Sequence, residues 1–424
     1  MIPGGGLATQ CLEGELSNNV FDELVERGFI AQVTDADAVR KALSEDPVTF
    51  YVGFDSTATS LHAGSLVPIM AMMHLQRAGH VPIFLTGGGT TMVGDPSGRT
   101  ELRQMLSEER IRANGASIHA QVNRYFHFDQ GQALALDNAD WLLQLNYVAF
   151  LRDIGVHFSV NRMLAAEAYK QRMEKGLSFI EFNYQLLQAY DYLDLYRHRG
   201  CTMQMGGDDQ WGNILAGVDL IRRVEGKTVH AMTFPLLTTA SGAKMGKTAG
   251  GAIWLDPDLL SPYDYFQYWV NCADEDVHKF LKMFTFLPLD EAARLGALQG
   301  AELREAKRVL AFEATRITHG QVAADEAMAA AKAAFGSGGD LDGMPTTTIS
   351  SVQLAEGLQL TAVMAETGLV HSRGDARRLI QQGGAYVNDE RVTEVNRTLS
   401  GDDLTADGIL LRAGKKRFHR LVVD

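Results

Sequence analysis

A strand, a helix and a second strand follow one another within about forty residues, and few folds accommodate that order. Residues 48–54 (VTFYVGF) are β-branched and aromatic and follow Pro47, which indicates a buried strand. An apolar helix is expected over residues 62–77, and Gly79 separates it from a second strand over residues 81–86. This order predicts a βαβ unit with parallel strands.

The same alternation continues further along the chain. A long polar helix is expected over residues 101–126, and further helices extend to residue 200. A strand at residues 202–205 and a helix at 211–224 follow them. We therefore expect an α/β fold in which residues 19–235 form a Rossmann-like, doubly wound domain with a helical insertion.

The rest of the chain separates into four segments by composition. Residues 1–18 are glycine-rich and then polar, which predicts a flexible N-terminal extension. Residues 274–334 become alanine-rich and helical, so we expect residues 236–335 to form a loop followed by a second, helical domain. Residues 336–351 have the Gly, Pro, Ser and Thr density of a linker. Residues 352–424 then form a small final domain.

Composition excludes several classes of protein. The 424 residues are 46% apolar, which is typical of globular chains and excludes disorder. The three cysteines, Cys11, Cys201 and Cys272, lie far apart without CxxC spacing, so we expect neither a disulfide framework nor a cysteine zinc site, and a reducing cytoplasm fits. No apolar run approaches the ~20 residues of a membrane span. The net charge of −13 argues against nonspecific wrapping of nucleic acid, but it allows a local basic patch.

Two short segments have the residue types that bind phosphate groups. Residues 55–65 (DSTATSLHAGS) open a helix, whose unpaired N–H groups and partial positive charge suit a triphosphate. Residues 241–248 (SGAKMGKT) have two lysines three apart beside a hydroxyl, and such a loop can close over transferring phosphates. Each segment alone is also compatible with an ordinary capping turn or surface loop.

Together, about 180 residues apart on an α/β chain, the two segments resemble the HIGH and KMSKS signatures of class I aminoacyl-tRNA synthetases. Residues 88–99 (GGTTMVGDPSGR), 182–196 (FNYQLLQAYDYLDLY) and 203–214 (MQMGGDDQWGNI) are similar to the bacterial tyrosyl-tRNA synthetases. The resemblance extends from about residue 20 to the C-terminus. It implies a ligase that activates L-tyrosine with ATP and transfers it to tRNA(Tyr).

The resemblance also implies a tyrosine pocket. Its phenol would be held by Tyr51 and Asp191, because a buried carboxylate accepts the phenolic hydrogen and phenylalanine would leave both groups unpaired. The spacing of Tyr184, Gln188 and Asp191 places all three on one face of a helix. The seven residues assigned to this pocket are Tyr51, Asp95, Asn138, Tyr184, Gln188, Asp191 and Gln210.

For the ATP side, the resemblance implies binding by Gly53, Asp55, Gly64, Gly206, Asp209 and Lys247, and catalysis by His62, Ser65, Lys244, Lys247 and Thr248. Both signature segments depart from the family pattern. Ser65 replaces the second histidine of HIGH, and Gly246 and Thr248 stand where KMSKS has serines. Serine still donates a hydrogen bond, but with a shorter reach. We expect Mg²⁺ to accompany ATP and no structural metal.

RNA contacts are implied at both ends of the chain. Residues 371–392 resemble the alpha-L RNA-binding motif, with Ser372 and three arginines on the first turns of a helix, and residues 412–420 hold five cations and no acid. A basic helix that only docks this domain is the alternative. The implied tRNA-binding residues are Asn161, Arg222, Arg223, Arg373, Arg377, Arg378, Lys415 and Lys416, with Arg99 and Arg103 as further acceptor-end candidates. The resemblance also implies a homodimer, and residues 147–160 are either its interface or part of the core.

Two other functions remain open from the sequence. A tryptophan-charging or other class I synthetase would share the same loops, although Tyr51 with Asp191 favours a phenol over an indole, which offers one donor and no acceptor. An RNA-binding protein with an inactive synthetase core is the second. The complete set of His62, Lys244, Lys247 and Asp191 argues against it.

Overall fold

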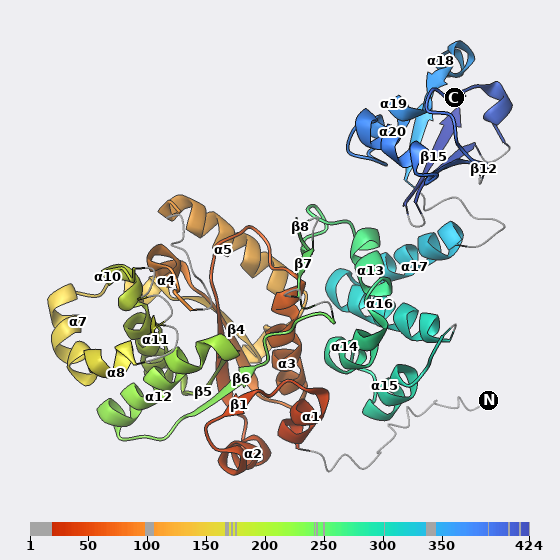
Figure 1. Ribbon diagram of the computed structural model, residues 1–424. Coiled ribbons are helices and arrows are strands. Elements are labelled where there is room, and N and C mark those ends of the chain that lie inside the picture. The colour runs from red at the N-terminus through yellow and green to blue at the C-terminus, as the bar shows by residue number, and fades with distance from the viewer. Residues whose placement is uncertain are drawn as a thin grey trace, which may run out of the picture. The chain divides into compact units, whose positions relative to one another are not determined.

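The structure is a computed structural model that describes residues 19–97, 106–165, 169–170, 173, 176–240, 242, 245–248, 251–300, 302–335, 345–388, 390–405, 408–414 and 417–423. The chain divides into two compact units (Figure 1). The first comprises Met1–Leu260 and Asn271–Thr318, and the second comprises Ser261–Val270 and His319–Asp424. Within the described ranges, no helix is both long and apolar enough to cross a membrane. The domain boundaries expected from the sequence stay predictions.

The first unit is built around a six-stranded sheet with the order β1-β6-β5-β2-β3-β4. Its strands are β1 (Gln32–Val33), β2 (Thr49–Phe54), β3 (Val81–Thr86), β4 (Leu134–Asp137), β5 (Cys201–Gly207) and β6 (His230–Phe234). All neighbours pair in parallel except β1, which is antiparallel to β6. The chain continues from β2 outward to β4 and then returns to the other side of β2 for β5 and β6. The sheet is therefore doubly wound, as predicted, and its switch point lies between β2 and β5.

Helices cover both faces of this sheet (Figure 1). The helices of the first unit are α1 (Val20–Arg27), α2 (Ala36–Glu45), α3 (Leu66–Arg77), α4 (Gly88–Val93), α5 (Glu108–Val122), α6 (Ala139–Leu142), α7 (Tyr147–Asp153), α8 (Val160–Leu164), α10 (Phe179–Phe182), α11 (Tyr184–Arg199), α12 (Trp211–Glu225), α14 (Val277–Phe284), α15 (Leu289–Gly296) and α16 (Leu303–His319). Tyr51 of β2 packs on one face with Tyr192 of α11 and Leu220 of α12. On the opposite face, Phe84 of β3 contacts His119 of α5. Alternate residues of each strand thus face different helices, as in a sheet that is buried on both sides.

The predicted and observed elements agree where the sequence pattern is long. The strands expected at 48–54, 81–86 and 202–205 are β2, β3 and β5, and the helix expected at 211–224 is α12. The helix expected at 62–77 begins instead as a 3-10 turn, because His62 accepts a hydrogen bond from the Gly64 N–H at its start. The other 3-10 turns are η2 (Asp129–Gly131), η3 (Gly155–His157), η4 (Asp208–Gln210), η5 (Asp274–Asp276) and η6 (Gly401–Asp403).

The second unit contains α13 (Pro262–Val270) and α17 (Gln321–Phe335), which pack against each other, and a C-terminal α+β domain. That domain has a five-stranded sheet with the order β12-β11-β14-β15-β9. Its strands and helices are β9 (Thr346–Ile349), α18 (Ser351–Glu356), β10 (Leu358–Gln359), α19 (Leu360–Glu366), α20 (Arg373–Gln381), β11 (Ala385–Val387), β12 (Glu390–Arg391), β13 (Thr398–Leu399), β14 (Ile409–Ala413) and β15 (Arg417–Val423). Leu360, Ile380, Leu411 and Leu421 join helices and sheet in one core.

One part of the expected linker is structured. Residues Thr346–Ile349 form β9, which pairs in parallel with β15 at the edge of the C-terminal sheet. Three threonines and an isoleucine are β-branched and therefore favour a strand once a partner is available. The threonine content suggested a linker, but the same residues serve as an edge strand.

Candidate active site

A cavity of about 510 Å³ opens at the carboxyl ends of β2 and β5. This is the switch point of the sheet, where open α/β folds bind their ligands. The cavity brings together fourteen of the residues that were predicted to bind tyrosine and ATP or to act in catalysis. They are Tyr51, Gly53, Asp55, His62, Gly64, Ser65, Asp95, Asn138, Tyr184, Gln188, Asp191, Gly206, Asp209 and Gln210.

One end of the cavity is lined by a buried hydroxyl and a buried carboxylate. Tyr51 is only 1% exposed, and its hydroxyl has no hydrogen-bond partner among the described residues. The Asp191 carboxylate accepts one hydrogen bond at each oxygen, from Asn138 Nδ2 at 2.9 Å and from Trp141 Nε1 at 2.8 Å. Each carboxylate oxygen still has a lone pair for a further donor. This end of the cavity therefore offers an acceptor and a hydroxyl to one polar ligand atom.

Burial dominates the ionisation of this pair. Burial raises the pKa of the Asp191 carboxyl to about 8, although the hydrogen bonds from Asn138 and Trp141 oppose the shift. Burial, together with the negative charge of Asp191, raises the pKa of the Tyr51 hydroxyl well above its usual value. The Tyr51 hydroxyl therefore stays neutral, and Asp191 becomes a better acceptor as its proton is lost.

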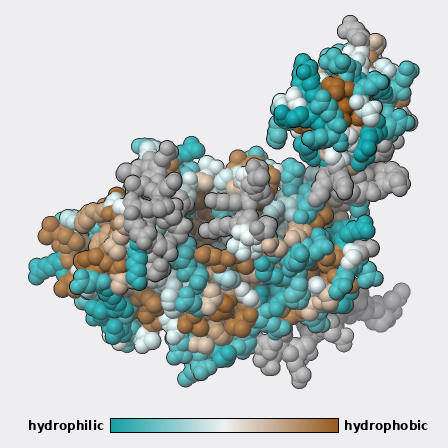
Figure 2. Space-filling model, in the orientation of Figure 1, coloured by the Kyte–Doolittle hydropathy of each residue, from teal (hydrophilic) through white to brown (hydrophobic). Residues whose placement is uncertain are grey.

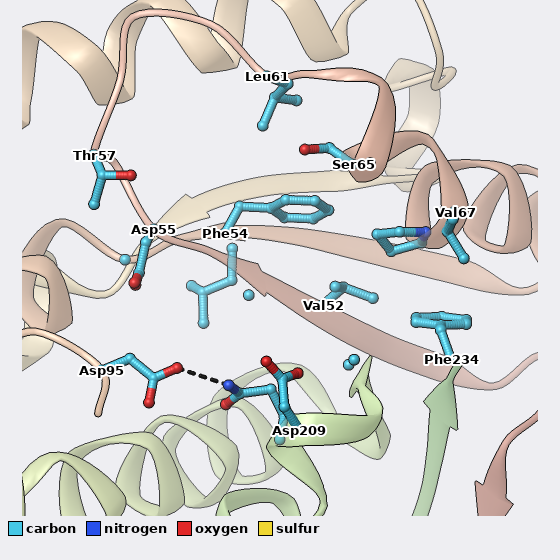
Figure 3. Close-up of a pocket in the computed structure, with 18 of the residues that line it drawn as sticks. Val52, Phe54, Asp55, Thr57, Leu61, Ser65, Val67, Asp95, Asp209 and Phe234 are labelled. Carbon is cyan, nitrogen blue, oxygen red and sulfur yellow. Dashed lines mark hydrogen bonds between the residues drawn. The ribbon is translucent and has the colours of Figure 1, made fainter. Parts of the chain in front are cut away.

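A second group of carboxylates lies further along the cavity. Figure 3 shows Asp55, Asp95 and Asp209 directed toward the same space, although they come from three different segments. Asp95 accepts hydrogen bonds from Gln210 Nε2 at 2.7 Å and from the Ser97 N–H at 2.9 Å. Burial first, and then the charge of Asp55, raises the pKa of Asp95 to about 6. Such a site favours a ligand cation.

The α11 face contributes polar groups to the same region. Tyr184 donates its hydroxyl hydrogen toward Asp55 Oδ1 at 3.4 Å. The Gln188 Oε1 atom is buried and has no hydrogen-bond partner among the described residues. Because an unpaired buried amide oxygen is unfavourable, it is best explained by a donor on the ligand. Tyr184, Gln188 and Asp191 all line the cavity from one helix, as their spacing predicted.

The opposite wall of the cavity is the start of α3. His62 Nδ1 accepts a hydrogen bond from the Gly64 N–H at 3.0 Å, so in the neutral imidazole the proton is on Nε2. Ser65 lies one residue before α3, where backbone N–H groups and the helix dipole favour an anion. This wall therefore offers hydrogen-bond donors, whereas the wall with Asp95 offers acceptors.

The two signature segments touch each other. Gly246 has a φ of +82°, and a side chain there would lie 2.6 Å from the Gly64 nitrogen and 2.9 Å from His62 Nδ1. The Gly246 carbonyl accepts from the Ile253 N–H at 2.9 Å, and the Ile253 carbonyl accepts from the Ala63 N–H at 2.7 Å. The departure from the family signature at Gly246 thus has a physical reason, because only glycine fits this approach.

The family comparisons agree with this geometry. The family model described as tRNA synthetases class I (W and Y) matches residues 43–336. The chain belongs to this family. A second model, described as the C-terminal domain of tyrosine–tRNA ligases, matches residues 339–421. The predicted α/β fold and enzyme class of this synthetase are therefore confirmed.

Curated relatives cover nearly the whole synthetase. The tyrosine–tRNA ligase of Clostridium tetani is 53% identical over 409 residues, which are 96% of this chain and 100% of the relative. That of Syntrophus aciditrophicus is 55% identical, with coverages of 96% and 99%. Among solved structures, a C-terminally truncated mitochondrial tyrosyl-tRNA synthetase of Aspergillus nidulans matches with a TM-score of 0.68 and 32% identity, covering 75% of this chain and 94% of that chain.

Some predicted site residues of the synthetase cannot be placed in the cavity. Lys244 lies outside the described residues, as do Arg99, Arg103, Lys415 and Lys416. Lys247 and Thr248 form β7, which pairs with β8 (Gly251–Ala252), and only their backbone is described. The catalytic roles of Lys244, Lys247 and Thr248 stay predictions.

The predicted tRNA contacts that the structure describes lie on three helices. Asn161 is on α8, and Arg222 and Arg223 are at the end of α12. Arg223 donates to the His157 carbonyl at 3.1 Å and lines a separate cavity of about 200 Å³. Arg373, Arg377 and Arg378 are on α20, where Arg373 pairs with Glu366 at 3.0 Å and Arg378 pairs with Asp375.

Two residues at the end of the cavity that holds Tyr51 and Asp191, called the tyrosine end below, were not predicted from the sequence. Trp141 fixes one oxygen of Asp191, and the buried Gln204 lines the cavity with an Oε1 atom that has no partner among the described residues. Trp141 follows Asn138 by three residues, so a helical turn at this point was the signal that could have identified it. Gln204 is paired in register with Tyr51 on the neighbouring strand, which only the sheet topology reveals.

Substitution of Gly246 should separate catalysis from tyrosine binding. We expect Gly246→Ala to slow tyrosine-dependent pyrophosphate exchange by ~10–100-fold, because a left-handed alanine costs about 1–2 kcal/mol and its Cβ would collide with Gly64. The dissociation constant for tyrosine, measured by calorimetry without ATP, should stay unchanged. Gly242→Ala is the matched control, since Gly242 has a φ of +80° in the same loop with nothing within 4 Å of its Cβ position. Equal losses in both variants would contradict the role of this contact.

Proposed function

We propose that this synthetase activates L-tyrosine with ATP to form tyrosyl-adenylate and pyrophosphate, and then transfers the tyrosyl group to the 3′ end of tRNA(Tyr). The observation that supports it best is the buried end of the cavity, where Tyr51 and Asp191 meet one polar ligand atom. The phenol donates its hydrogen to Asp191, and its oxygen accepts from Tyr51. The name tyrosine–tRNA ligase, which the curated relatives have, agrees with this pairing.

The remainder of the amino acid follows from the charges along the cavity. Its ammonium lies at Asp95, with Tyr184 and Gln188 as further acceptors, because this is where three carboxylates converge. Its carboxylate then points toward the donor wall at His62 and Ser65. This arrangement places the phosphates of ATP on the donor wall and away from Asp95, whose negative charge would repel them.

The chemical step needs positioning and charge stabilisation only. The tyrosine carboxylate attacks the α-phosphorus of ATP in line, and the bond to the pyrophosphate oxygen breaks. His62 donates from Nε2 to the phosphate oxygens, and Ser65 donates to a ribose oxygen, while Asp209 accepts from the ribose hydroxyls. Lys244, Lys247 and Thr248 bind the pyrophosphate as its charge develops. Gly53, Gly64 and Gly206 allow ATP to approach the backbone closely.

Mg²⁺ arrives with ATP in this proposal, as hard cations usually do with phosphates. When bound, it would neutralise charge on the pyrophosphate. Within the described ranges, no three or more His, Cys, Asp or Glu side chains gather as metal ligands.

Tryptophan is the alternative amino acid. An indole offers one N–H donor and no acceptor, so it would satisfy Asp191 but leave the buried Tyr51 hydroxyl without a partner. A solved tryptophanyl-tRNA synthetase of Encephalitozoon cuniculi matches with a TM-score of 0.55 at 14% identity, which is a likeness of fold alone. The hydrogen-bond pairing of the cavity therefore favours tyrosine.

For tRNA, we propose that the acceptor end contacts Asn161, Arg222 and Arg223. The C-terminal domain would contact the body of the tRNA through Arg373, Arg377 and Arg378 of α20 and through Lys415 and Lys416. Arginine side chains bind phosphates with paired donors, which suits this role. The enzyme acts in the cytoplasm in this proposal.

We also propose a homodimer. Figure 2 shows apolar surface gathered over α7 and α8, and large exposed apolar side chains continue onto α10. Val148 is 73% exposed, Val156 72% and Phe179 70%. The members of this apolar surface are Tyr147, Val148, Leu151, Val156, Val160, Phe179 and Ile180. Contiguous apolar surface on this scale is typical of an interface between subunits.

The test of the function is ATP–pyrophosphate exchange with each of the twenty amino acids. We expect exchange with tyrosine alone, and charging of tRNA(Tyr) alone in the second step. A variant with both Lys244→Ala and Lys247→Ala should lose exchange but keep tyrosine binding. Exchange near the wild-type rate in that variant would contradict the role of the loop, and exchange with tryptophan would contradict the amino acid.

A further inference from the structure

Residues 241–248, with Lys244 and Lys247, are called the lysine loop below. An ion pair at the start of α14 contacts the backbone of the segment that leads into this loop. The Ala240 N–H donates to Asp276 Oδ2 at 2.9 Å, four residues before Lys244 in the sequence. Lys279 Nζ donates to the Thr238 carbonyl at 3.1 Å and pairs with Asp276 Oδ1 at 3.3 Å. Asp276 is only 4% exposed. One aspartate and one lysine are therefore hydrogen-bonded to the backbone of residues 238–240 at two positions.

The position of Asp276 makes this contact unexpected. Asp276 is the N-cap residue of α14, and an aspartate there ordinarily accepts hydrogen bonds from the first backbone N–H groups of its own helix. It makes no such capping bond. Its carboxylate instead faces the Ala240 N–H. A role in stabilising α14 alone therefore does not explain this side chain.

The other end of α14 is fixed to the body of the first unit. The buried Arg27 of α1 donates to the Lys282 carbonyl at 3.0 Å and to the Leu287 carbonyl at 2.9 Å. Phe280 and Phe284 are fully buried, and α14 lies beside α3, the helix that begins at the donor wall of the cavity (Figure 1). A helix that is held at its C-terminal end and packed along its length transmits its position to its N-terminal end.

Residues 238–240 lead directly into the lysine loop. The Gly242 N–H donates to the Thr239 carbonyl at 2.8 Å, which closes a turn immediately after Ala240. The Met245 N–H then donates to the Leu237 carbonyl at 2.9 Å, and Gly246 contacts Gly64. Among the described residues, Asp276 and Lys279 thus contact the backbone at 240 and 238, and the start of α3 contacts Gly246.

We propose that Asp276, together with Lys279, is a positioning residue that sets where the lysine loop lies over ATP and thereby sets the rate of adenylate formation. The inference rests on the proposed function of Lys244 and Lys247 in that loop. Because the contacts are made to the backbone at 238 and 240, they act on the loop and not on the tyrosine end of the cavity. The effect should appear in the ATP-dependent step.

The test compares variants of the enzyme at Asp276, Asp274 and Lys279. Asp276→Ala removes the acceptor for the Ala240 N–H, and we expect the rate of tyrosyl-adenylate formation at saturating ATP to fall about tenfold, as for the loss of one buried hydrogen bond. Asp276→Asn keeps an acceptor oxygen at the same place and should recover the rate to within about threefold of wild type. The dissociation constant for tyrosine without ATP should be unchanged in both variants.

Asp274→Ala is the matched control. Asp274 belongs to the same 3-10 turn and also pairs with a lysine, Lys307, but that lysine donates to the Cys272 carbonyl and not to the loop. We expect wild-type rates in this variant. If Asp276→Ala does not fold, Lys279→Met provides the second measurement, since it removes the contact to the Thr238 carbonyl from a side chain that is 40% exposed. We expect it to slow adenylate formation by about threefold.

The outcomes separate this inference from the proposed function. A wild-type enzyme that does not form adenylate with tyrosine and ATP would overturn the proposed function. With an active wild type, unchanged rates in Asp276→Ala and Lys279→Met would overturn the inference. The inference would also be overturned if Asp276→Asn did not recover the rate that Asp276→Ala loses. It would likewise be overturned if Asp276→Ala lowered the tyrosine affinity and the melting temperature in proportion to the rate.

Discussion

Asp191→Asn is expected to reduce kcat/KM for tyrosine in pyrophosphate exchange by ~10³-fold. Both oxygens of Asp191 already accept from a donor, Asn138 Nδ2 on one side and Trp141 Nε1 on the other. An asparagine amide has one oxygen only, so its NH₂ group would face a donor in a buried site. The variant also loses the charged acceptor for the phenol. Together, these losses amount to ~4 kcal/mol.

The same variant should lose selectivity and a pH dependence. The carboxyl of Asp191 has a pKa raised to about 8, so below that pH the empty wild-type enzyme holds a proton there. Tyrosine needs the ionised acceptor, so the KM for tyrosine should rise as the pH falls from about 8.5 to 6.5, by up to ~10-fold per unit. In Asp191→Asn, the KM for tyrosine should not change with pH in this range. Phenylalanine should compete better with tyrosine for this variant than for the wild type. A wild-type KM that is constant with pH would sink this account of the phenol contact.

Much of the Rossmann-like part of the fold was predictable from the sequence because β2, β3 and β5 have six or seven residues each and are largely buried. β2, β3 and α12 were expected at nearly their observed bounds. β4 and β6 were not expected, since β4 has only four residues and neither contrasts strongly with its flanks. Strand order needs long-range pairing, so the antiparallel β1 at the sheet edge could not be inferred from local pattern.

The candidate site was predictable where residues recur at fixed spacing on one element. Tyr184, Gln188 and Asp191 follow the helical repeat, and the structure brings them to one cavity wall. Gln204 depends on its pairing with Tyr51 across two strands, and no local rule identifies such a partner, whereas Trp141 could have been found only from its helical spacing to Asn138. The same limit applies to Asp276, where the local rule predicts a helix cap and the fold directs the carboxylate to another segment.

Assembly provides the second large expected effect. We expect the wild-type enzyme to have twice the chain mass of 46.4 kDa in light scattering at micromolar concentration. A variant with both Val148→Asp and Val156→Asp should be a monomer, because each side chain is highly exposed in one chain and would be buried against the other subunit in the proposed dimer. Four unpaired buried carboxylates per dimer should raise the dissociation constant by at least ~10³-fold.

The control for this variant is the same valine-to-aspartate substitution at an exposed position elsewhere on the chain. Val322 on α17 is 71% exposed, and Val322→Asp adds the same charge outside the apolar surface on α7, α8 and α10. It should leave the mass at two chains. Charging of tRNA should fall with dimer dissociation if one tRNA spans both subunits, so charging and mass should follow the same dependence on enzyme concentration. A wild-type monomer would contradict the homodimer, and a Val148→Asp, Val156→Asp variant that remains dimeric would contradict this surface as its interface.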